Sequence, residues 1–323
     1  KVDYDLDVMT NGQDLFDVSV KIMIGMKKVL EKSKPNIILV HGDTTTALTA
    51  ALSGFYMQIP IGHVEAGLRT NDIYSPFPEE VNRQLISRIA SFNFTPTENS
   101  KLNLINENVN PDKIFVTGNT VIDALMSKVA EARLSKFPKD VVSILSSFGG
   151  NKKRKILLVT GHRRENFGSG LENICNALIE IAELHPLLDI IYPVHLNPKV
   201  MEPVTSALSK IHNIHLIKPL EYISFIKLMD ISYIILTDSG GIQEEAPSLN
   251  KPVLVTREKT ERPEAIETGA IRLVGTKTKK IVSSVDLLLS DKNEYQKMAD
   301  GLNPFGNGQA SLRIKNKIEE VLS

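Results

Sequence analysis

Short apolar runs alternate with longer amphipathic stretches along almost the whole chain. Each run is bounded by polar or glycine-containing loops, and a stretch with helical spacing usually follows. This alternation is typical of parallel β-sheets with helices on both faces. We expect strands at residues 37–40, 61–64, 92–94, 114–116, 156–159, 190–192, 214–217, 231–236 and 252–255.

The apolar runs fall into two series. The first ends near residue 118, and the second resumes near residue 155 after a polar connector, Phe148–Arg154. A chain of 323 residues is also long for one typical domain. We therefore predict an α/β protein with two Rossmann-like parallel-sheet domains that face a cleft. In such sheets ligands bind beyond the carboxyl ends of the strands, so the loops after each strand are the candidates for chemistry.

Composition excludes several classes of function. Lys and Arg together number 38, equal to Asp and Glu, so the net charge is zero and favours neither nucleic acid nor an anionic membrane as a partner. Cys175 is the single cysteine, which rules out a disulfide framework and fits a cytoplasmic protein. No apolar run has membrane-spanning length. Since the chain starts at Lys1 without a methionine, we expect that an N-terminal piece is missing.

The segment Thr237–Glu245 (TDSGGIQEE) carries the most information. It follows an apolar run and opens a helix with Ser239, Gly240 and Gly241. Exposed backbone N–H groups at a helix start favour an anion such as phosphate. Glu245 lies one to two turns further, where a carboxylate accepts hydrogen bonds from sugar hydroxyls. The segment fits a nucleoside diphosphate with a sugar attached, although a turn that needs glycine for its geometry alone gives the same pattern.

Other strand-end loops are rich in functional side chains. These loops are His41–Thr46, Glu65–Thr70, Ser75–Glu80 and Thr160–Asn166. Taken singly, each has a structural explanation as a helix cap, a helix first turn or a solvated surface. Taken together, they place three acids, a histidine and several arginines at strand ends, which favours acid–base chemistry on an anionic substrate.

Metal and dinucleotide sites are not supported by the sequence. No HExxH, CxxC or carboxylate cluster of metal-site spacing is present, and His212 and His215 have no suitable partner nearby. No GxGxxG follows a strand. We expect no metal and no cofactor. His63, two residues before Glu65, is interpreted as a packed histidine.

Six segments in one order resemble the bacterial non-hydrolysing UDP-N-acetylglucosamine 2-epimerases. They are residues 41–46 (HGDTTT), 63–70 (HVEAGLRT), 78–83 (PEEVNR), 161–166 (GHRREN), 238–245 (DSGGIQEE) and 260–264 (TERPE). The resemblance implies a GT-B-type fold. It divides the chain into an N-terminal domain over residues 1–118, a UDP-binding domain over residues 119–308 and a C-terminal helix over residues 309–323 that returns to the first domain.

The resemblance also implies an activity. Members interconvert UDP-N-acetylglucosamine and UDP-N-acetylmannosamine, use no nicotinamide cofactor, and are usually homodimers; some bind a second UDP-N-acetylglucosamine as an effector. UDP is eliminated to give a 2-acetamidoglucal and then added back. The matching catalytic residues are Asp43, Glu65, Glu79 and His162. The matching substrate-binding residues are Arg83, Arg163, Phe225, Ser239, Gly240, Gly241, Glu245 and Arg262.

The front of the chain departs from the family pattern. The first strand and the basic Gly-Thr-Arg-Pro-Glu-like loop are absent, and Leu220 stands where some members have glutamine. We therefore expect the 323-residue chain to bind UDP weakly and to turn over little substrate. Three alternatives stay open: a hydrolysing relative that releases N-acetylmannosamine, a 2-epimerase of a modified UDP-sugar, and a glycosyltransferase or non-catalytic nucleotide-sugar-binding protein.

Overall fold

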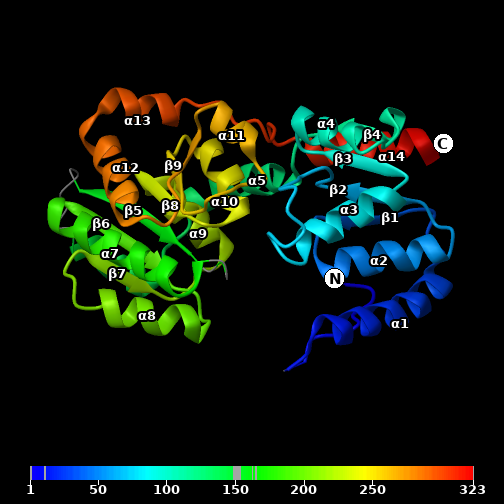
Figure 1. Ribbon diagram of the computed structural model, residues 1–323, viewed down its shortest axis with the longest axis horizontal. Coiled ribbons are helices and arrows are strands. Elements are labelled where there is room, and N and C mark those ends of the chain that lie inside the picture. The colour runs from blue at the N-terminus through cyan, green and yellow to red at the C-terminus, as the bar shows by residue number, and fades with distance from the viewer. Residues whose placement is uncertain (1, 11, 148–153, 162, 164–165, 323) are drawn as a thin grey trace. The chain divides into compact units, whose positions relative to one another are not determined.

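The chain forms two compact units. The computed structural model describes residues 2–10, 12–147, 154–161, 163 and 166–322. Unit 1 contains residues 1–123 and 305–323, and unit 2 contains residues 124–304. The sequence-based domain boundaries were placed at 118 and 308. The connector expected at 148–154 lies, except for Arg154, outside the described residues. Figure 1 shows the elements of each unit.

Unit 1 is built on a four-stranded parallel sheet with strand order β1-β2-β3-β4. The strands are β1 (Ile38–His41), β2 (Ile61–Val64), β3 (Phe92–Thr95) and β4 (Ile114–Val116). Strand order follows chain order, so each connection crosses to the neighbouring strand. All carboxyl ends therefore lie at one edge of the sheet, and the loops after β1 and β2 are adjacent.

Several helices of unit 1 begin at side-chain caps. The helices of this unit are α1 (Leu15–Ser33), α2 (Thr45–Tyr56), α3 (Glu79–Ile89), α4 (Glu98–Asn106) and α14 (Ala310–Leu322), with a 3-10 turn at Pro111–Lys113. The Thr44 hydroxyl accepts the Ala47 N–H at 3.1 Å and caps α2. The carboxylate of Asp123 accepts the N–H groups of Ala310 and Ser311, so it caps α14 within the same unit.

Unit 2 is built on a six-stranded parallel sheet with strand order β10-β9-β8-β5-β6-β7. The strands are β5 (Lys155–Thr160), β6 (Leu188–Pro193), β7 (Ile214–Ile217), β8 (Ile234–Thr237), β9 (Val253–Val255) and β10 (Ile271–Leu273). The order reverses between β5 and β8, which pair directly. A ligand in an open α/β sheet binds at such a switch point, beyond the carboxyl ends of the two strands.

The helices of unit 2 enclose the larger core. They are α6 (Lys139–Ser147), α7 (Ser169–Leu184), α8 (Pro198–Leu208), α9 (Tyr222–Ile231), α10 (Gly240–Glu245), α11 (Pro263–Glu267), α12 (Thr278–Ser290) and α13 (Lys292–Ala299), with a 3-10 turn at Ala246–Leu249. Helix α5 (Thr120–Leu134) runs across the boundary between the units. Side chains of α7, α8 and α12 pack on β5, β6 and β8, and Leu157, Leu178, Ile190 and Val204 are fully buried among them.

The predicted fold class is confirmed: both units are parallel-sheet α/β domains. Each run expected to form a strand does so, with one boundary wrong. The run 231–236 was expected to be a strand throughout, but Ile231 ends α9 and β8 begins at Ile234. An apolar run does not show where a buried helix gives way to a buried strand. Strand β10 was not anticipated, because Arg272 at its centre interrupts the apolar run.

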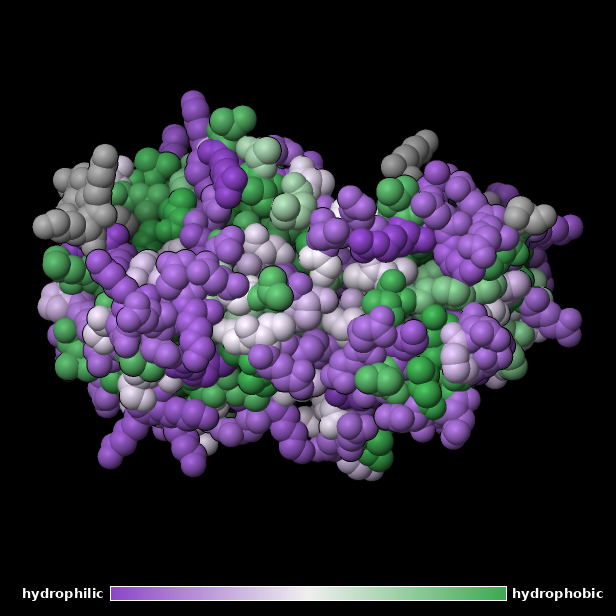
Figure 2. Space-filling model, turned by 90° about the horizontal axis from the view of Figure 1, so that it is seen from above, coloured by the Kyte–Doolittle hydropathy of each residue, from purple (hydrophilic) through white to green (hydrophobic). Residues whose placement is uncertain are grey.

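The surface is mainly polar on the face shown in Figure 2, where hydrophobic residues occur in separate groups. Among the helices that the structure describes, none combines the length and the hydropathy needed to cross a membrane.

Candidate active site

Two of the three expected catalytic acids lie at adjacent strand ends in unit 1. Asp43 follows β1 and Glu65 follows β2, and the last residues of these strands, His41 and Val64, are paired in register. Glu79 is the first residue of α3. The side-chain amide of Asn82, one turn further along α3, donates to the Asp43 carbonyl at 2.8 Å. The start of α3 is thereby tied to the β1 loop, and all three acids are only half-buried.

Glu65 has a backbone conformation that is unusual for its residue type. Its φ is +66°, in the left-handed region where side chains other than glycine are disfavoured. Its carboxylate accepts a hydrogen bond from the Asn119 amide at 2.8 Å, and His41 Nε2 lies 3.7 Å from the same oxygen. Asn119 is itself buried. Such conformations persist where the surroundings impose them, and they are enriched at functional sites.

Asp43 is held by a buried arginine. Nη2 of Arg83 lies 2.7 Å from Asp43 Oδ2, and Nη1 of the same guanidinium lies 3.4 Å from Glu80 Oε2. Arg83 is 3% exposed. The sequence-based expectation was that Arg83 contacts substrate. In the structure its guanidinium pairs with Asp43 and Glu80, and the substrate contact stays a prediction.

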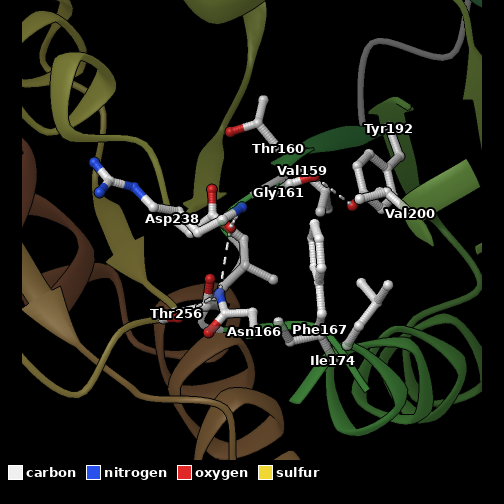
Figure 3. Close-up of a pocket in the computed structure, with 13 residues that line it drawn as sticks. Val159, Thr160, Gly161, Asn166, Phe167, Ile174, Tyr192, Val200, Asp238 and Thr256 are labelled. Carbon is white, nitrogen blue, oxygen red and sulfur yellow. Dashed lines mark hydrogen bonds between the residues drawn. The ribbon is translucent and has the colours of Figure 1, made fainter. Parts of the chain in front are cut away.

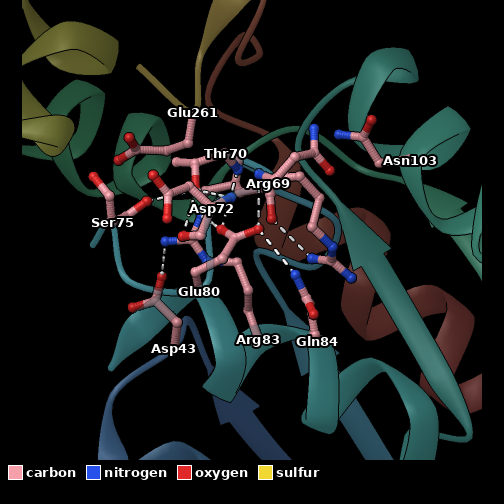
Figure 4. Close-up of polar contacts among 12 residues, drawn as sticks. Asp43, Arg69, Thr70, Asp72, Ser75, Glu80, Arg83, Gln84, Asn103 and Glu261 are labelled. Carbon is pink, nitrogen blue, oxygen red and sulfur yellow. Dashed lines mark hydrogen bonds and ion pairs between the residues drawn. The ribbon is translucent and has the colours of Figure 1, made fainter. Parts of the chain in front are cut away.

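Glu80 connects α3 to the loop that separates Glu65 from Glu79 (Figure 4). Its fully buried carboxylate accepts the backbone N–H groups of Thr70 and Asn71, both at 3.1 Å. It also accepts a hydrogen bond from Gln84. The hydroxyl of Thr70 donates to the Ser75 carbonyl, which folds the loop back on itself. The relative placement of Glu65 and Glu79 therefore depends on Glu80.

The carboxyl ends of β5 and β8 line a pocket in unit 2 (Figure 3). Asp238 is one of the lining residues and is 1% exposed. One of its carboxylate oxygens accepts the Arg163 N–H at 2.9 Å and the Asn166 amide at 3.2 Å. Asn166 donates to the Thr256 carbonyl as well. Asp238 thus fastens the loop after β5 to the loop after β8. His162, the fourth expected catalytic residue, lies outside the described residues.

The two glycines of the Ser239–Gly241 segment differ in their surroundings. A Cβ at Gly240 would lie 2.7 Å from Nη1 of Arg262, so this glycine makes room for the guanidinium. A Cβ at Gly241 would meet no atom within 4 Å. Only at Gly241 is there open space beside the backbone at the start of α10. The Arg262 guanidinium thus gives a structural reason for the glycine at position 240, and the close approach of a ligand stays a prediction for both glycines.

Arg262 belongs to a buried cluster of charges. Its Nε donates to Glu244 at 2.5 Å and its Nη1 donates to Glu261. Arg257 donates to the second oxygen of Glu261 at 2.9 Å. Arg262 is 5% exposed. Removing it would leave two buried carboxylates poorly compensated, which typically costs about 3–5 kcal/mol. A loss of UDP binding in an Arg262→Ala variant would therefore need a separate measurement of folding to be interpreted.

Glu245 ends α10 as expected and is buried. The Tyr222 hydroxyl donates to Glu245 Oε1 at 2.5 Å. Burial raises the pKa of Glu245 above its ordinary value, and the hydrogen bond from Tyr222 opposes this shift. Tyr222 begins α9, and Phe225, another expected substrate contact, lies one turn further and is partly buried. Since residues three apart share a helix face, Phe225 lies on the side of α9 that Tyr222 presents to Glu245.

Several residues of these networks were not functional candidates in the sequence analysis, among them Glu80, Asn119, Tyr222 and Asp238. Glu80 and Asp238 lie inside recognised segments, beside residues that were assigned roles. Asn119 and Tyr222 act on acids 54 and 23 positions away in the chain, and no local pattern signals such a pairing. The described residues contain no group of three or more His, Cys, Asp or Glu side chains that could hold a metal ion.

A family model described as UDP-N-acetylglucosamine 2-epimerase matches residues 1–319. The UDP-N-acetylglucosamine 2-epimerase of Yersinia pestis is 55% identical over 313 residues, which cover 97% of this chain and 83% of the relative. The enzyme of the same name from Escherichia coli K12 is 53% identical over 312 residues, with 97% and 83% covered. This chain belongs to the UDP-N-acetylglucosamine 2-epimerase family.

A solved structure supports the same assignment. The UDP-GlcNAc 2-epimerase of Neisseria meningitidis, in a crystal structure bound to UDP-GlcNAc, superimposes with a TM-score of 0.93 at 47% identity. The match covers 99% of this chain and 86% of that one. The resemblance read from the six sequence segments is confirmed.

Proposed function

We propose that this chain interconverts UDP-N-acetylglucosamine and UDP-N-acetylmannosamine without hydrolysis. The observation that carries the proposal is the group of acids after β1, after β2 and at the start of α3. Asp43 is oriented by Arg83 and Glu65 by Asn119, so at least two of the three carboxylates have fixed positions. Inversion at C2 requires a base on one face of the sugar and an acid on the other, which such a group supplies.

The proposed reaction proceeds by elimination and re-addition. One carboxylate takes the proton from C2, the electron pair forms the C1–C2 double bond, and the C1–O bond breaks to release UDP. The 2-acetamidoglucal then accepts a UDP phosphate oxygen at C1, and a carboxylic acid protonates C2 from the opposite face. Both steps are redox-neutral, so no nicotinamide or other oxidant is required. Carboxyl groups in a shared environment can take different protonation states, as an acid and a base must here.

UDP recognition is assigned to unit 2. The open backbone beside Gly241 gives phosphate oxygens access to N–H groups at the start of α10. Glu245, which accepts a hydrogen bond from Tyr222, is proposed to accept hydrogen bonds from ribose hydroxyls. The UDP-GlcNAc bound to the Neisseria meningitidis relative supports this substrate class. His162 is proposed to interact with the leaving phosphate, as its family motif implies.

The test is an NMR assay of the full-length protein with UDP-N-acetylglucosamine in D₂O, because little turnover is expected of the 323-residue chain. The proposal expects UDP-N-acetylmannosamine to accumulate to an equilibrium mixture, with deuterium at C2 and the phosphorus signals of UDP-sugar retained. Free N-acetylmannosamine with stoichiometric UDP would instead identify a hydrolysing enzyme. Binding of UDP without any change at C2 would exclude epimerisation of this substrate and leave a modified UDP-sugar, glycosyl transfer or binding alone.

A further inference from the structure

His63 contacts the loop that carries Asp43. It lies in β2 and is 0% exposed. Its Nε2 is 2.9 Å from the carbonyl oxygen of Gly42, the residue directly before Asp43. A carbonyl oxygen only accepts hydrogen bonds, so Nε2 carries the ring proton in this contact. The side chain of β2 thereby holds the backbone at the end of β1.

Gly42 is held from both sides by β2. Its N–H donates to the Val64 carbonyl at 3.0 Å, while its carbonyl accepts from His63. Gly42 has a φ of +67°, so a turn begins here. The two bonds fix the position of the turn relative to Val64, which directly precedes Glu65. The separation of the Asp43 and Glu65 backbones is therefore set by β2.

Packing does not explain a histidine at this position. Val40, His63 and Asn93 are register partners on β1, β2 and β3, so their side chains lie side by side on one face of the sheet. Among the described residues, His63 Nδ1 and both polar side-chain atoms of Asn93 are buried without a hydrogen-bond partner. Unsatisfied buried polar atoms destabilise a fold, and apolar side chains would avoid that cost. The contact that His63 gains in return is the bond to Gly42.

Burial lowers the pKa of His63 to about 4. The ring is consequently neutral at physiological pH, with its proton on Nε2. A buried neutral imidazole that already donates to the backbone has no proton to exchange with a substrate. His63 is suited to fix geometry rather than to act as an acid or base.

We propose that His63 is a positioning residue for C2 epimerisation, and that its Nε2–H bond to the Gly42 carbonyl fixes Asp43 relative to Glu65. The inference rests on the proposed function, because it assigns His63 to the same reaction. Misplacing a catalytic group by about 1 Å costs up to roughly a hundredfold in rate. Substrate affinity should change little, since the groups assigned to UDP lie in unit 2.

The experiment compares the wild type with three variants. His63→Leu removes the donor, His63→Gln keeps an N–H donor, and Asn93→Val changes the neighbouring buried residue without touching Gly42. We expect kcat to fall about tenfold to hundredfold in His63→Leu with KM and the UDP dissociation constant nearly unchanged. His63→Gln should recover most of kcat, and Asn93→Val should keep wild-type kcat. Nitrogen-15 NMR of the wild type should show an Nε2–H imidazole that does not titrate between about pH 5.5 and about pH 8.

The outcomes separate the two proposals. A wild type that never changes C2 of UDP-N-acetylglucosamine defeats the proposed function, whereas the imidazole spectrum still tests the Gly42 bond. A folded His63→Leu variant with wild-type kcat overturns the inference. Equal losses of kcat in His63→Leu and Asn93→Val also overturn the inference. The packing of the buried side chains Val40, His63 and Asn93, rather than the hydrogen bond to Gly42, would then control the rate. If His63→Leu does not fold, an Nδ1–H tautomer or a titrating ring in the wild type overturns the inference.

Discussion

At the scale of single residues, the backbone conformation of Glu65 distinguishes this proposed catalytic acid from an ordinary surface carboxylate. A left-handed conformation in a residue other than glycine costs on the order of 1–3 kcal/mol. Asn119 donates to its carboxylate and His41 Nε2 lies 3.7 Å from the same oxygen, so the side chain has a defined position. A surface carboxylate that served only solubility would not require this unfavourable backbone conformation.

Conversion of Asp43→Asn, Glu65→Gln or Glu79→Gln should lower kcat by about 10²–10⁴-fold, because each change removes a positioned acid or base. UDP affinity measured by calorimetry should fall only modestly. Glu31→Gln, at an exposed surface ion pair on α1, is the matched control and should keep wild-type kcat. Near wild-type turnover in all three acid variants would refute the assignment. A comparable loss of UDP affinity would recast the acids as ligand-binding groups.

The adjacent glycines give a second prediction. Gly240→Ala should lower the denaturant midpoint, because the new methyl group would lie 2.7 Å from the Arg262 guanidinium in a buried charge cluster. Gly241→Ala should keep the wild-type midpoint and still weaken UDP binding, because its methyl group enters space that a phosphate would occupy. Chemical denaturation and UDP calorimetry on both variants provide the comparison. If the two variants had the same denaturant midpoint and the same UDP affinity, the space beside Gly241 would have no special role in ligand binding.

At the scale of secondary-structure elements, the sequence predicted the strands and the loops that carry the acids. Both follow from local patterns: apolar runs mark buried strands, and parallel strands bring their following loops to one edge. The partners of the acids were not predictable in this way. Asn119 reaches Glu65, and Glu80 reaches the Thr70 backbone, only after the elements have packed. Arg83 and Arg262 were recognised as functional positions, but their buried ion pairs were visible only in three dimensions.

Glu80 gives a prediction for the loop between β2 and α3. In Glu80→Gln the amide can accept one of the two backbone N–H groups of Thr70 and Asn71, while its own NH₂ faces the other. Leaving a buried donor unsatisfied costs about 1–3 kcal/mol, so the unfolding free energy should fall by this amount. The turnover number should fall as well, because Glu79 shares the start of α3. An unchanged unfolding free energy would show that the loop does not depend on this carboxylate.

At the scale of the whole molecule, the candidate chemistry is divided between the two units. The three acids and the residues that orient them belong to unit 1, and the residues assigned to UDP belong to unit 2. This division explains why variants in unit 1 should act on kcat and variants in unit 2 on UDP affinity. Stability, in contrast, depends on buried polar groups in both units. His63 in unit 1 and Asp189 in unit 2 have pKa values shifted from their ordinary values.

Acidification should destabilise the folded protein first through His63. Burial is the largest cause of its lowered pKa, and Arg69 and His41 act in the same direction; the bond to Gly42 and the charge of Glu65 oppose them. Between the ordinary pKa of 6.5 and the folded value of about 4, the unfolded chain binds more protons than the folded protein. The contribution of His63 is thus complete above pH 6.5 and is lost as the pH falls toward 4.

The expected loss in unfolding free energy is about 2 kcal/mol between about pH 6.5 and about pH 5, at roughly 1.4 kcal/mol per pH unit. Asp189 contributes in a lower range. Burial, the largest single influence, raises the pKa of Asp189, but the hydrogen bonds from His215 and Arg154 together outweigh it and lower this pKa, so the contribution of Asp189 disappears only below the ordinary pKa of 3.8. Denaturant titrations of the wild type and of His63→Gln across this pH range isolate the contribution of His63 to the unfolding free energy, because glutamine does not titrate. The unfolding free energy of the wild type should fall relative to that of His63→Gln as the pH is lowered, and a constant difference between the two would show that His63 does not change its protonation on unfolding.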